Sequence, residues 1–170
     1  MTKVIAEPME LPEGYMLVRC DPAELSPNMI DAVIAVLQAG GAVDVNSARD
    51  AIPAATALFL LLYRGELVGL GAIKGGRPWY ARRVQERSGH AFDQAMLELG
   101  YVSVCPGHTR LHLSGHIVDA LLSEYDGALF ATTDHERMKS TLGHRGFVQY
   151  GVEWDGDRGA LSLWLRPLEH

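Results

Sequence analysis

A polar segment between a strand pattern and a helix pattern is the part of this sequence best suited to bind an anion. Residues 102–104 alternate like a strand, Pro106 and Gly107 interrupt the alternation, and apolar residues recur at helical spacing from Leu113 onwards. Residues 108–112, HTRLH, lie between the two patterns. The first amides of a helix lack intrahelical partners, and the helix dipole places positive charge at the same end. A loop in this position can therefore hold a phosphate or diphosphate group.

The elements that would position this loop alternate between strands and helices. A helix beginning at Ser26 and Pro27 and ending at Gly40 is predicted from its cap residues and apolar face. A second, short helix is expected to begin at Asn46 or Ser47, and further helices follow the polar loop and span residues 134–145. Strands are predicted over residues 15–20, 57–63, 67–74, 96–104, 127–133, 147–154 and 160–165. Because the strand, loop and helix at 96–122 lead into another strand, we expect a right-handed parallel crossover between antiparallel hairpins.

Composition limits the class of protein. A chain of 170 residues with 48% hydrophobic residues can bury a core of ordinary size. Its net charge of −6 argues against a general nucleic-acid binder, and no apolar run reaches the length of a membrane span. Two cysteines, Cys20 and Cys105, suit a reducing compartment, so we expect a cytoplasmic protein. We divide the chain into a flexible leader (1–14), a single domain (15–167) with an insert (75–93), and the stump of an affinity tag (168–170).

The element order, the Val104-x-Pro106 strand exit and the closing Gly146-Phe147 pair resemble the GNAT superfamily of acyl-CoA-dependent N-acyltransferases. The resemblance runs from Tyr15 to Arg166. It implies an α/β fold with a mixed, partly splayed sheet of about six or seven strands and helices on both faces. It also implies transfer of an acetyl group from acetyl-CoA, or another acyl group from its acyl-CoA, to a primary amine of a small molecule or protein. Direct attack in a ternary complex would need no metal.

The family motif that binds the pyrophosphate of acetyl-CoA can be matched to the polar loop in two registers. One register assigns the family's Arg or Gln and two small residues to Thr109, His112 and Ser114. The other, which demands an insertion, assigns them to Arg110, Leu113 and Gly115. In the family, the preceding strand splays from its neighbour and pairs with the pantetheine arm. The resemblance therefore implies a cofactor site formed by Val102, Ser103, Val104, Thr109, Arg110, Leu111, His112, Leu113, Ser114 and Gly115.

Catalysis of amide formation requires a base for the attacking ammonium and an acid for the leaving thiolate. Gly100 inside the strand pattern suggests a bulge or a close backbone approach at the point of splaying. The resemblance implies that Glu98 acts as the base through water. The family's usual Tyr acid falls on Leu142, which leaves Tyr101 and His135 as candidate acids.

Two other functions stay open beside this one. The missing Tyr acid and the degenerate loop also fit a CoA-binding module without activity. The insert suggests an acyl-CoA-dependent enzyme that modifies nucleic acid, because a pattern of arginines and aromatics can stack a base and pair phosphates, although a solvated helix explains the pattern more simply. The residues of this pattern are Lys74, Arg77, Arg82, Arg83 and Arg87 with Trp79 and Tyr80. We expect the insert to lie near the acceptor end of the cleft. A homodimer is a further open alternative.

Histidines recur every four residues at His108, His112 and His116, a spacing that on a helix could form a metal face. Pro106 and Gly107 place the first two before the helix, and neither cysteine nor carboxylate completes a site. We therefore expect no metal.

Overall fold

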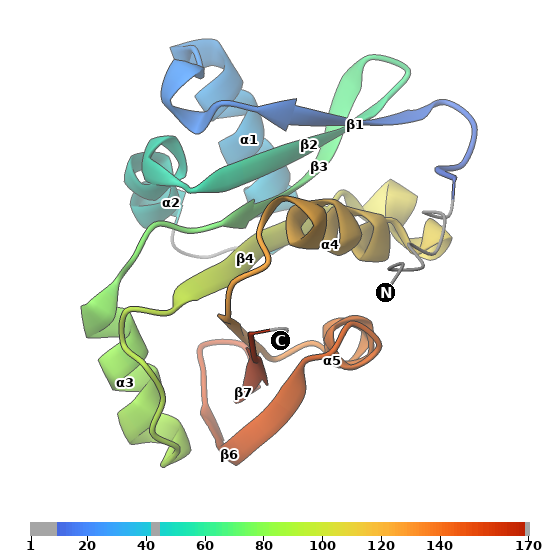
Figure 1. Cartoon of the computed structure of the whole chain (residues 1–170). Helices are drawn as coiled ribbons and strands as arrows, with labels where there is room; N and C mark the ends of the chain where they lie inside the picture. The colour runs from blue at the N-terminus through green and yellow to red at the C-terminus, as the bar shows by residue number, and fades with distance from the viewer. Residues whose placement is uncertain (1–9, 42–44, 169–170) are drawn as a thin grey trace, which may run out of the picture.

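The computed structural model of the protein describes residues 10–41 and 45–168. Seven strands form one mixed sheet in the order β1-β2-β3-β4-β5-β7-β6, in which only β4 and β5 are parallel (Figure 1). The strands are β1 (Tyr15–Cys20), β2 (Ala57–Tyr63), β3 (Glu66–Ile73), β4 (Leu97–Val104), β5 (Leu129–Thr133), β6 (Val148–Asp155) and β7 (Ala160–Arg166). The predicted mixed sheet with a parallel central pair is confirmed.

Helices connect these strands at the positions that their capping residues indicate. Ser26 caps the first α-helix by accepting a hydrogen bond from the Met29 amide (3.2 Å), and Gly40 ends that helix, as predicted. The α-helices are α1 (Pro27–Ala39), α2 (Val45–Ala51), α3 (Pro78–Ser88), α4 (Leu113–Glu124) and α5 (Glu136–Gly143). Three short 3-10 helices are η1 (Pro22–Glu24), η2 (Ile52–Ala54) and η3 (Pro106–Leu111).

Both faces of the sheet are covered because successive side chains of a strand point to opposite sides. On β2, Leu58 and Leu60 pack with Val33 and Leu37 of α1, while Leu61 packs on the other side with α4. Helix α3 packs on Phe130 of β5, and α5 joins the core on the α4 side. Figure 1 shows α4 and α5 in front of the sheet. Each fully buried aliphatic side chain contributes about 1.5–3 kcal/mol, so these two layers hold the site's framework.

The sheet opens at its centre. β4 pairs with β5 only at Leu97↔Leu129 and Glu98↔Phe130, whereas β3 accompanies β4 as far as Val104. The partly splayed sheet is therefore confirmed, and the opening begins after Glu98. Beyond this residue, β4 runs beside β3 on one side and faces the opening on the other.

A β-bulge lies at the opening, next to the glycine that suggested it. The β3–β4 register shifts between Leu70 and Ala72, so Gly71 faces the two residues Tyr101 and Val102. Tyr101 has a φ of 55°, a left-handed conformation that is uncommon for a residue with a side chain. The extra residue turns the Tyr101 side chain towards the α1 face of the sheet.

Several boundaries differ from the sequence-based prediction. α2 begins at Val45, so Asn46 and Ser47 occupy its first turn instead of capping it. The insert contains an eleven-residue helix, α3, with Pro78 at its start and Gly89 in the left-handed conformation at its end. Residues 1–9 of the expected leader and 169–170 of the expected tag lie outside the described residues. Among the helices described, none has the length and apolar character to cross a membrane.

Candidate active site

A cavity of about 790 Å³ occupies the opening between β4 and β5. Its walls are residues 99–104 of β4, residues 131–135 at the end of β5, the first residues of α4, and parts of α1 and α5. This volume is within the range of small-molecule sites. Val102, Ser103 and Val104, three of the residues expected to contact the cofactor, all line it.

The polar loop closes one end of this cavity. Residues 106–111 form η3, His112 adopts a left-handed conformation with a φ of 54°, and α4 starts at Leu113. Thr109, Leu113 and Ser114 line the cavity. The α4 N-terminus therefore meets the end of the opening, the geometry that suits a phosphate group.

The remaining residues of the predicted loop site lie outside the cavity lining. Arg110, Leu111 and His112 are exposed. A side chain on Gly115 would meet the Arg145 guanidinium at 2.6 Å, so this glycine is directed towards α5 instead. Arg145 itself donates to Asp119 (2.7 Å), an ion pair that links the two helices. Two residues of the first register, Thr109 and Ser114, line the cavity, whereas the shifted register contributes Leu113 alone. The choice between the registers stays a prediction.

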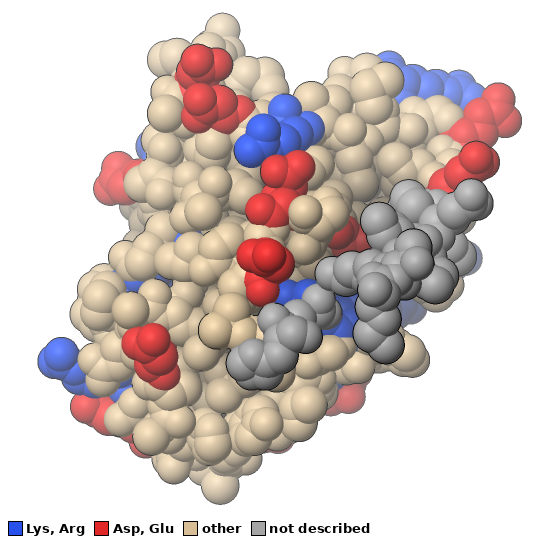
Figure 2. All heavy atoms as spheres, in the orientation of Figure 1, with Lys and Arg blue, Asp and Glu red and all other residues tan. Residues whose placement is uncertain are grey.

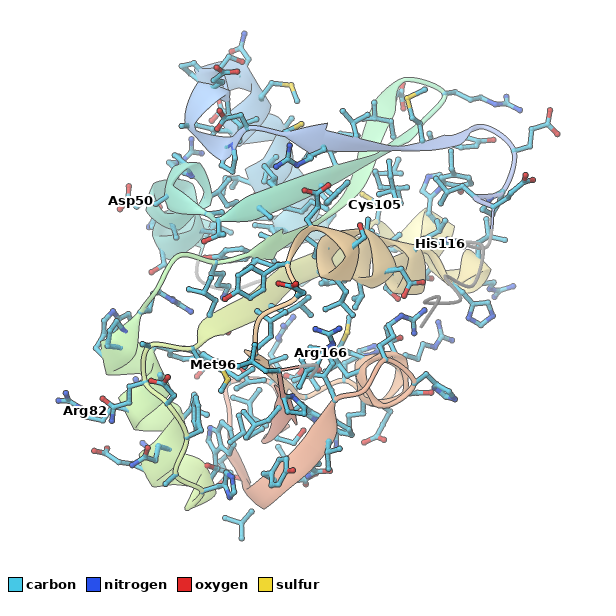
Figure 3. The ribbon with its side chains drawn as sticks, viewed as in Figure 1. Asp50, Arg82, Met96, Cys105, His116 and Arg166 are labelled. Carbon is cyan, nitrogen blue, oxygen red and sulfur yellow. The ribbon has the colours of Figure 1, made fainter. Side chains whose placement is uncertain are left out.

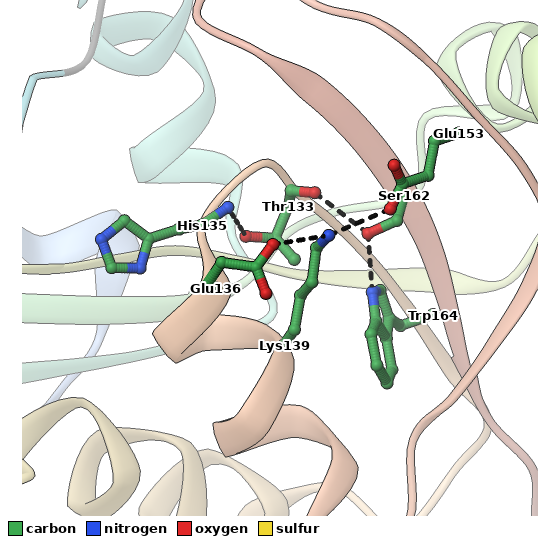
Figure 4. Close-up of polar contacts among 7 residues, drawn as sticks. All are labelled: Thr133, His135, Glu136, Lys139, Glu153, Ser162 and Trp164. Atoms are coloured by element: carbon green, nitrogen blue, oxygen red, sulfur yellow. Dashed lines mark hydrogen bonds and ion pairs between the residues drawn. The ribbon is translucent and has the colours of Figure 1, made fainter.

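The catalytic candidates are only partly brought together. Tyr101 and His135 both line the cavity, and so does the otherwise buried Leu142 at the position of the family's Tyr acid. His135 precedes α5 and its backbone N–H donates to Thr133 Oγ1 at 3.1 Å (Figure 4). Glu98 does not line the cavity, and its side chain is 7% exposed. Its role as a base stays a prediction.

Two cations hold the Glu98 carboxylate. Its Oε1 lies 2.6 Å from Arg77 Nη2 and 3.4 Å from Lys74 Nζ. Burial lowers the pKa of Lys74, while the charge of Glu98 opposes this shift. The Lys74 ammonium also lies 4.1 Å from the centre of the Tyr101 ring. Glu98, Lys74 and the bulge residue thus form one connected group at the start of the opening.

A second pocket, of about 410 Å³, lies on the other side of Tyr101, and we call it the α3 pocket. It is lined by Lys74, by α3 with the Arg77 that precedes it, and by the turn of the β6–β7 hairpin. Tyr101 and Leu161 line both cavities, so the two adjoin there. Tyr80 in its wall donates to or accepts from Thr132 (3.0 Å), and burial together with the nearby Glu98 charge raises the pKa of this tyrosine. The insert lies beside the opening, and its position at the acceptor end stays a prediction.

Sequence reasoning missed five polar residues of the main cavity: Thr132, Thr133, Asp134, Arg137 and Arg158. The first four lie between the end of β5 and the first turn of α5, a position that the strand and helix patterns already indicated. Arg158 comes from the β6–β7 hairpin, donates to the Gly41 carbonyl and lies 3.9 Å from Asp134. No local signal could have placed Arg158, because its contacts depend on how the two halves of the sheet face each other.

Several solved structures with this arrangement are acyltransferases. An acetyltransferase of the GNAT family from Streptococcus agalactiae is 16% identical, with a TM-score of 0.67 over 93% of this chain and 98% of its own. The chain has the GNAT fold. An acyl-CoA N-acyltransferase from Pseudomonas aeruginosa (11% identity, TM-score 0.64, 89% and 99% coverage) shares it. So does a GNAT family acetyltransferase from Elizabethkingia anophelis with acetyl-CoA bound (11% identity, TM-score 0.58, 92% and 100% coverage). No protein-family model and no curated protein matches the chain.

The GNAT fold accounts for the splayed strand, whereas the chemistry of the opening depends on the side chains of this protein. Among the described residues, no group of three or more His, Cys, Asp or Glu could hold a metal ion. His108, from the predicted histidine series, bonds instead to the Tyr15 hydroxyl at 2.5 Å. The polar groups available in the cavity are hydroxyls, two arginines, His135, the Asp134 carboxylate and backbone amides.

Proposed function

We propose that the protein is an N-acyltransferase that moves an acetyl group from acetyl-CoA to a primary amine. The observation that carries the proposal is the cavity along the splayed part of β4, which ends at the N-terminus of α4. Such a cavity offers strand backbone to an extended amide-containing arm and helix amides to a diphosphate. The acetyl-CoA bound to the Elizabethkingia anophelis structure supports the same ligand here.

The reaction balances without a further reactant. The amine nitrogen attacks the thioester carbonyl, a C–N bond forms, the C–S bond breaks, and the thiolate leaves. The nitrogen loses two protons overall if it enters as an ammonium; one goes to the thiolate and the other to solvent. Holding amine and thioester in one site supplies much of the rate by proximity.

The cofactor contacts that we propose lie along β4 and at the α4 end of the opening. The backbone of Val102 and Val104 would pair with the pantetheine arm, and Thr109 and Ser114 would meet the diphosphate beside the first amides of α4. Arg137, in the first turn of α5, lines the same cavity and supplies a positive charge. Arg137 and Arg158 line this space, whereas Arg110 does not.

Proton transfer involves groups at the other end. Tyr101 and His135 are the candidate acids for the thiolate, because both line the cavity. Glu98 is buried beneath Lys74 and Arg77, so a proton taken from the acceptor would reach it through Lys74 or through water. Burial already lowers the pKa of Lys74, which makes the neutral amine of this residue more accessible than that of a surface lysine.

A CoA-binding module without activity is the second candidate function. Leu142, fully buried at the cavity wall where the family's acid would stand, favours it. Release of free CoA thiol from acetyl-CoA, measured with and without a panel of primary amines, distinguishes the two. Amine-dependent release together with the N-acetyl product by mass spectrometry supports the enzyme. Tight acetyl-CoA binding without release for any amine would instead establish the binding module.

A further inference from the structure

We propose that the acceptor is a small amine that also carries an oxyanion, a carboxylate or a phosphate, and that the α3 pocket binds this oxyanion. The inference rests on the proposed N-acyltransferase function and names its substrate class. It follows from the charge of the α3 pocket, from the placement of its guanidinium groups and from its junction with the main cavity.

The α3 pocket concentrates positive charge in an acidic protein. Lys74, Arg77, Arg83 and Arg87 line it, against Asp155 and Asp157, whereas the whole chain carries −6. Even with the Glu98 carboxylate beneath Lys74 and Arg77, cations outnumber carboxylates. A pocket of this kind attracts an anionic group and repels a purely cationic amine.

The arginines are placed to act together. Arg83 and Arg87 are four residues apart on α3 and therefore project from the same face of this helix. Arg77 is fixed by Glu98 at 2.6 Å, and its carbon Cζ lies 4.5 Å from the centre of the Tyr80 ring. A guanidinium that is held in place at the pocket wall suits recognition of a planar carboxylate or a phosphate.

All three arginines of α3 are exposed, but Arg82 does not line the pocket and points away from the body of the protein in Figure 3. The other two arginines of the helix line the pocket. Arg82 is consequently a matched control for the other two.

The junction with the main cavity explains why the ligand should be an amine acceptor. Tyr101 and Leu161 line both cavities, so a molecule whose oxyanion contacts α3 can direct its amine towards the start of the splayed strand. The surrounding cations would also lower the pKa of the bound ammonium, which favours the neutral nucleophile.

The opposite wall argues for a small zwitterion over nucleic acid. Asp155 and Asp157, in the turn of the β6–β7 hairpin, face the same pocket and would repel a continuous phosphate backbone. On the face shown in Figure 2, acidic and basic side chains are interspersed and form no extended basic surface. A short molecule with one ammonium and one oxyanion suits a pocket that contains both signs of charge.

The test compares amines with and without an anionic group, of which O-phosphoethanolamine and ethanolamine form a matched pair. With saturating acetyl-CoA, we expect kcat/KM for O-phosphoethanolamine or aspartate to exceed that for ethanolamine or putrescine by at least about tenfold. The double variant Arg83→Glu/Arg87→Glu should lose at least about tenfold of this preference, whereas Arg82→Glu should keep it. Equal use of neutral and anionic amines, or an equal loss in Arg82→Glu, would overturn the proposal.

A second readout does not depend on turnover. Trp79 and Trp154 line the α3 pocket, so titration with O-phosphoethanolamine or aspartate should change the tryptophan fluorescence of the wild type and of Arg82→Glu, but not of Arg83→Glu/Arg87→Glu. Acetyl-CoA affinity should be the same in all three proteins. If the wild type neither binds acetyl-CoA nor releases CoA in an amine-dependent way, the proposed function is refuted. If the wild type does both but shows no fluorescence change with the small anions, only the anion site is refuted. Single-stranded DNA is the contrasting ligand. If it changes the fluorescence of the wild type but not of the double variant, and the small anions change neither, the pocket binds nucleic acid and the proposal is overturned.

Discussion

Replacing Glu98 with Gln tests whether one buried carboxylate organises the acceptor side of the site. Its side chain is 7% exposed and its Oε1 contacts both Arg77 and Lys74, which are 23% and 13% exposed. Removing one partner of a buried ion pair typically costs about 3–5 kcal/mol. Gln keeps an oxygen that can accept from Arg77, and both cations retain some contact with water. We therefore expect the free energy of unfolding to fall by about 2–4 kcal/mol.

A double-mutant cycle with Lys74→Met isolates the contact from the general effect of the substitution. In the Lys74→Met background, Glu98→Gln leaves one cation without its partner instead of two, so its cost should shrink by about 1–2 kcal/mol. Urea unfolding followed by circular dichroism measures all four proteins. Additivity to within about 0.5 kcal/mol would refute the reasoning, because it would show that the two side chains do not interact in solution.

The same variant separates chemistry from binding. Glu98→Gln should reduce turnover by about 100-fold, the usual size of a general-base contribution, whether the carboxylate accepts the proton or holds Lys74 in position. Its dissociation constant for acetyl-CoA should stay at the wild-type value, since Glu98 does not line the cofactor cavity. Intact turnover on the true acceptor would remove Glu98 from the mechanism.

Three further predictions concern the cofactor loop and the buried lysine. Arg137→Ala should raise the dissociation constant for acetyl-CoA about five- to tenfold in calorimetry, and Arg110→Ala should raise it less, because Arg137 lines the cavity and Arg110 does not. A larger effect of Arg110→Ala than of Arg137→Ala would favour the shifted loop register. Gly115→Leu should lower the free energy of unfolding by about 1–3 kcal/mol by displacing Arg145, with acetyl-CoA affinity unchanged; weaker binding without loss of stability would place this glycine in the cofactor site. Burial lowers the pKa of Lys74 in the folded protein below its ordinary 10.5, so the unfolded chain binds more protons at pH values between the folded and the unfolded pKa. The free energy of unfolding of the wild type, relative to that of Lys74→Met, should therefore rise with pH towards 10.5. A fall of this difference in urea unfolding would contradict the prediction.

Much of the secondary structure can be predicted from the sequence because helix caps and strand patterns are local signals. Ser26 and Pro27 begin α1 where predicted, and the strand at 15–20 has the bounds of β1. The bulge was inferred from Gly100, yet the left-handed residue is Tyr101. A side chain at Gly100 would meet Lys74 Cε at 2.5 Å, so this glycine leaves room for the lysine beside it.

The composition of the site was harder to predict because it depends on segments that are distant in sequence. Gly115 matched the family's small residue in one register, but the space beside it belongs to Arg145 of a later segment. The sequence suggested Glu98 as a base but did not indicate its two cationic partners, which follow β3 and precede α3. The pattern of arginines in the insert was visible in the sequence, whereas which of them line the pocket depends on the orientation of α3.

Acetyl-CoA binding followed by thermal unfolding tests the central claim most directly. At about 100 times its dissociation constant, a ligand that binds only the folded chain adds about 2.7 kcal/mol to the free energy of unfolding. For a chain of this length that corresponds to a rise in Tm of about 5–11 °C. We predict a rise of this size with millimolar acetyl-CoA or with a longer acyl-CoA. An unchanged Tm with all of them would contradict the assignment of the opening between β4 and β5 to an acyl-CoA.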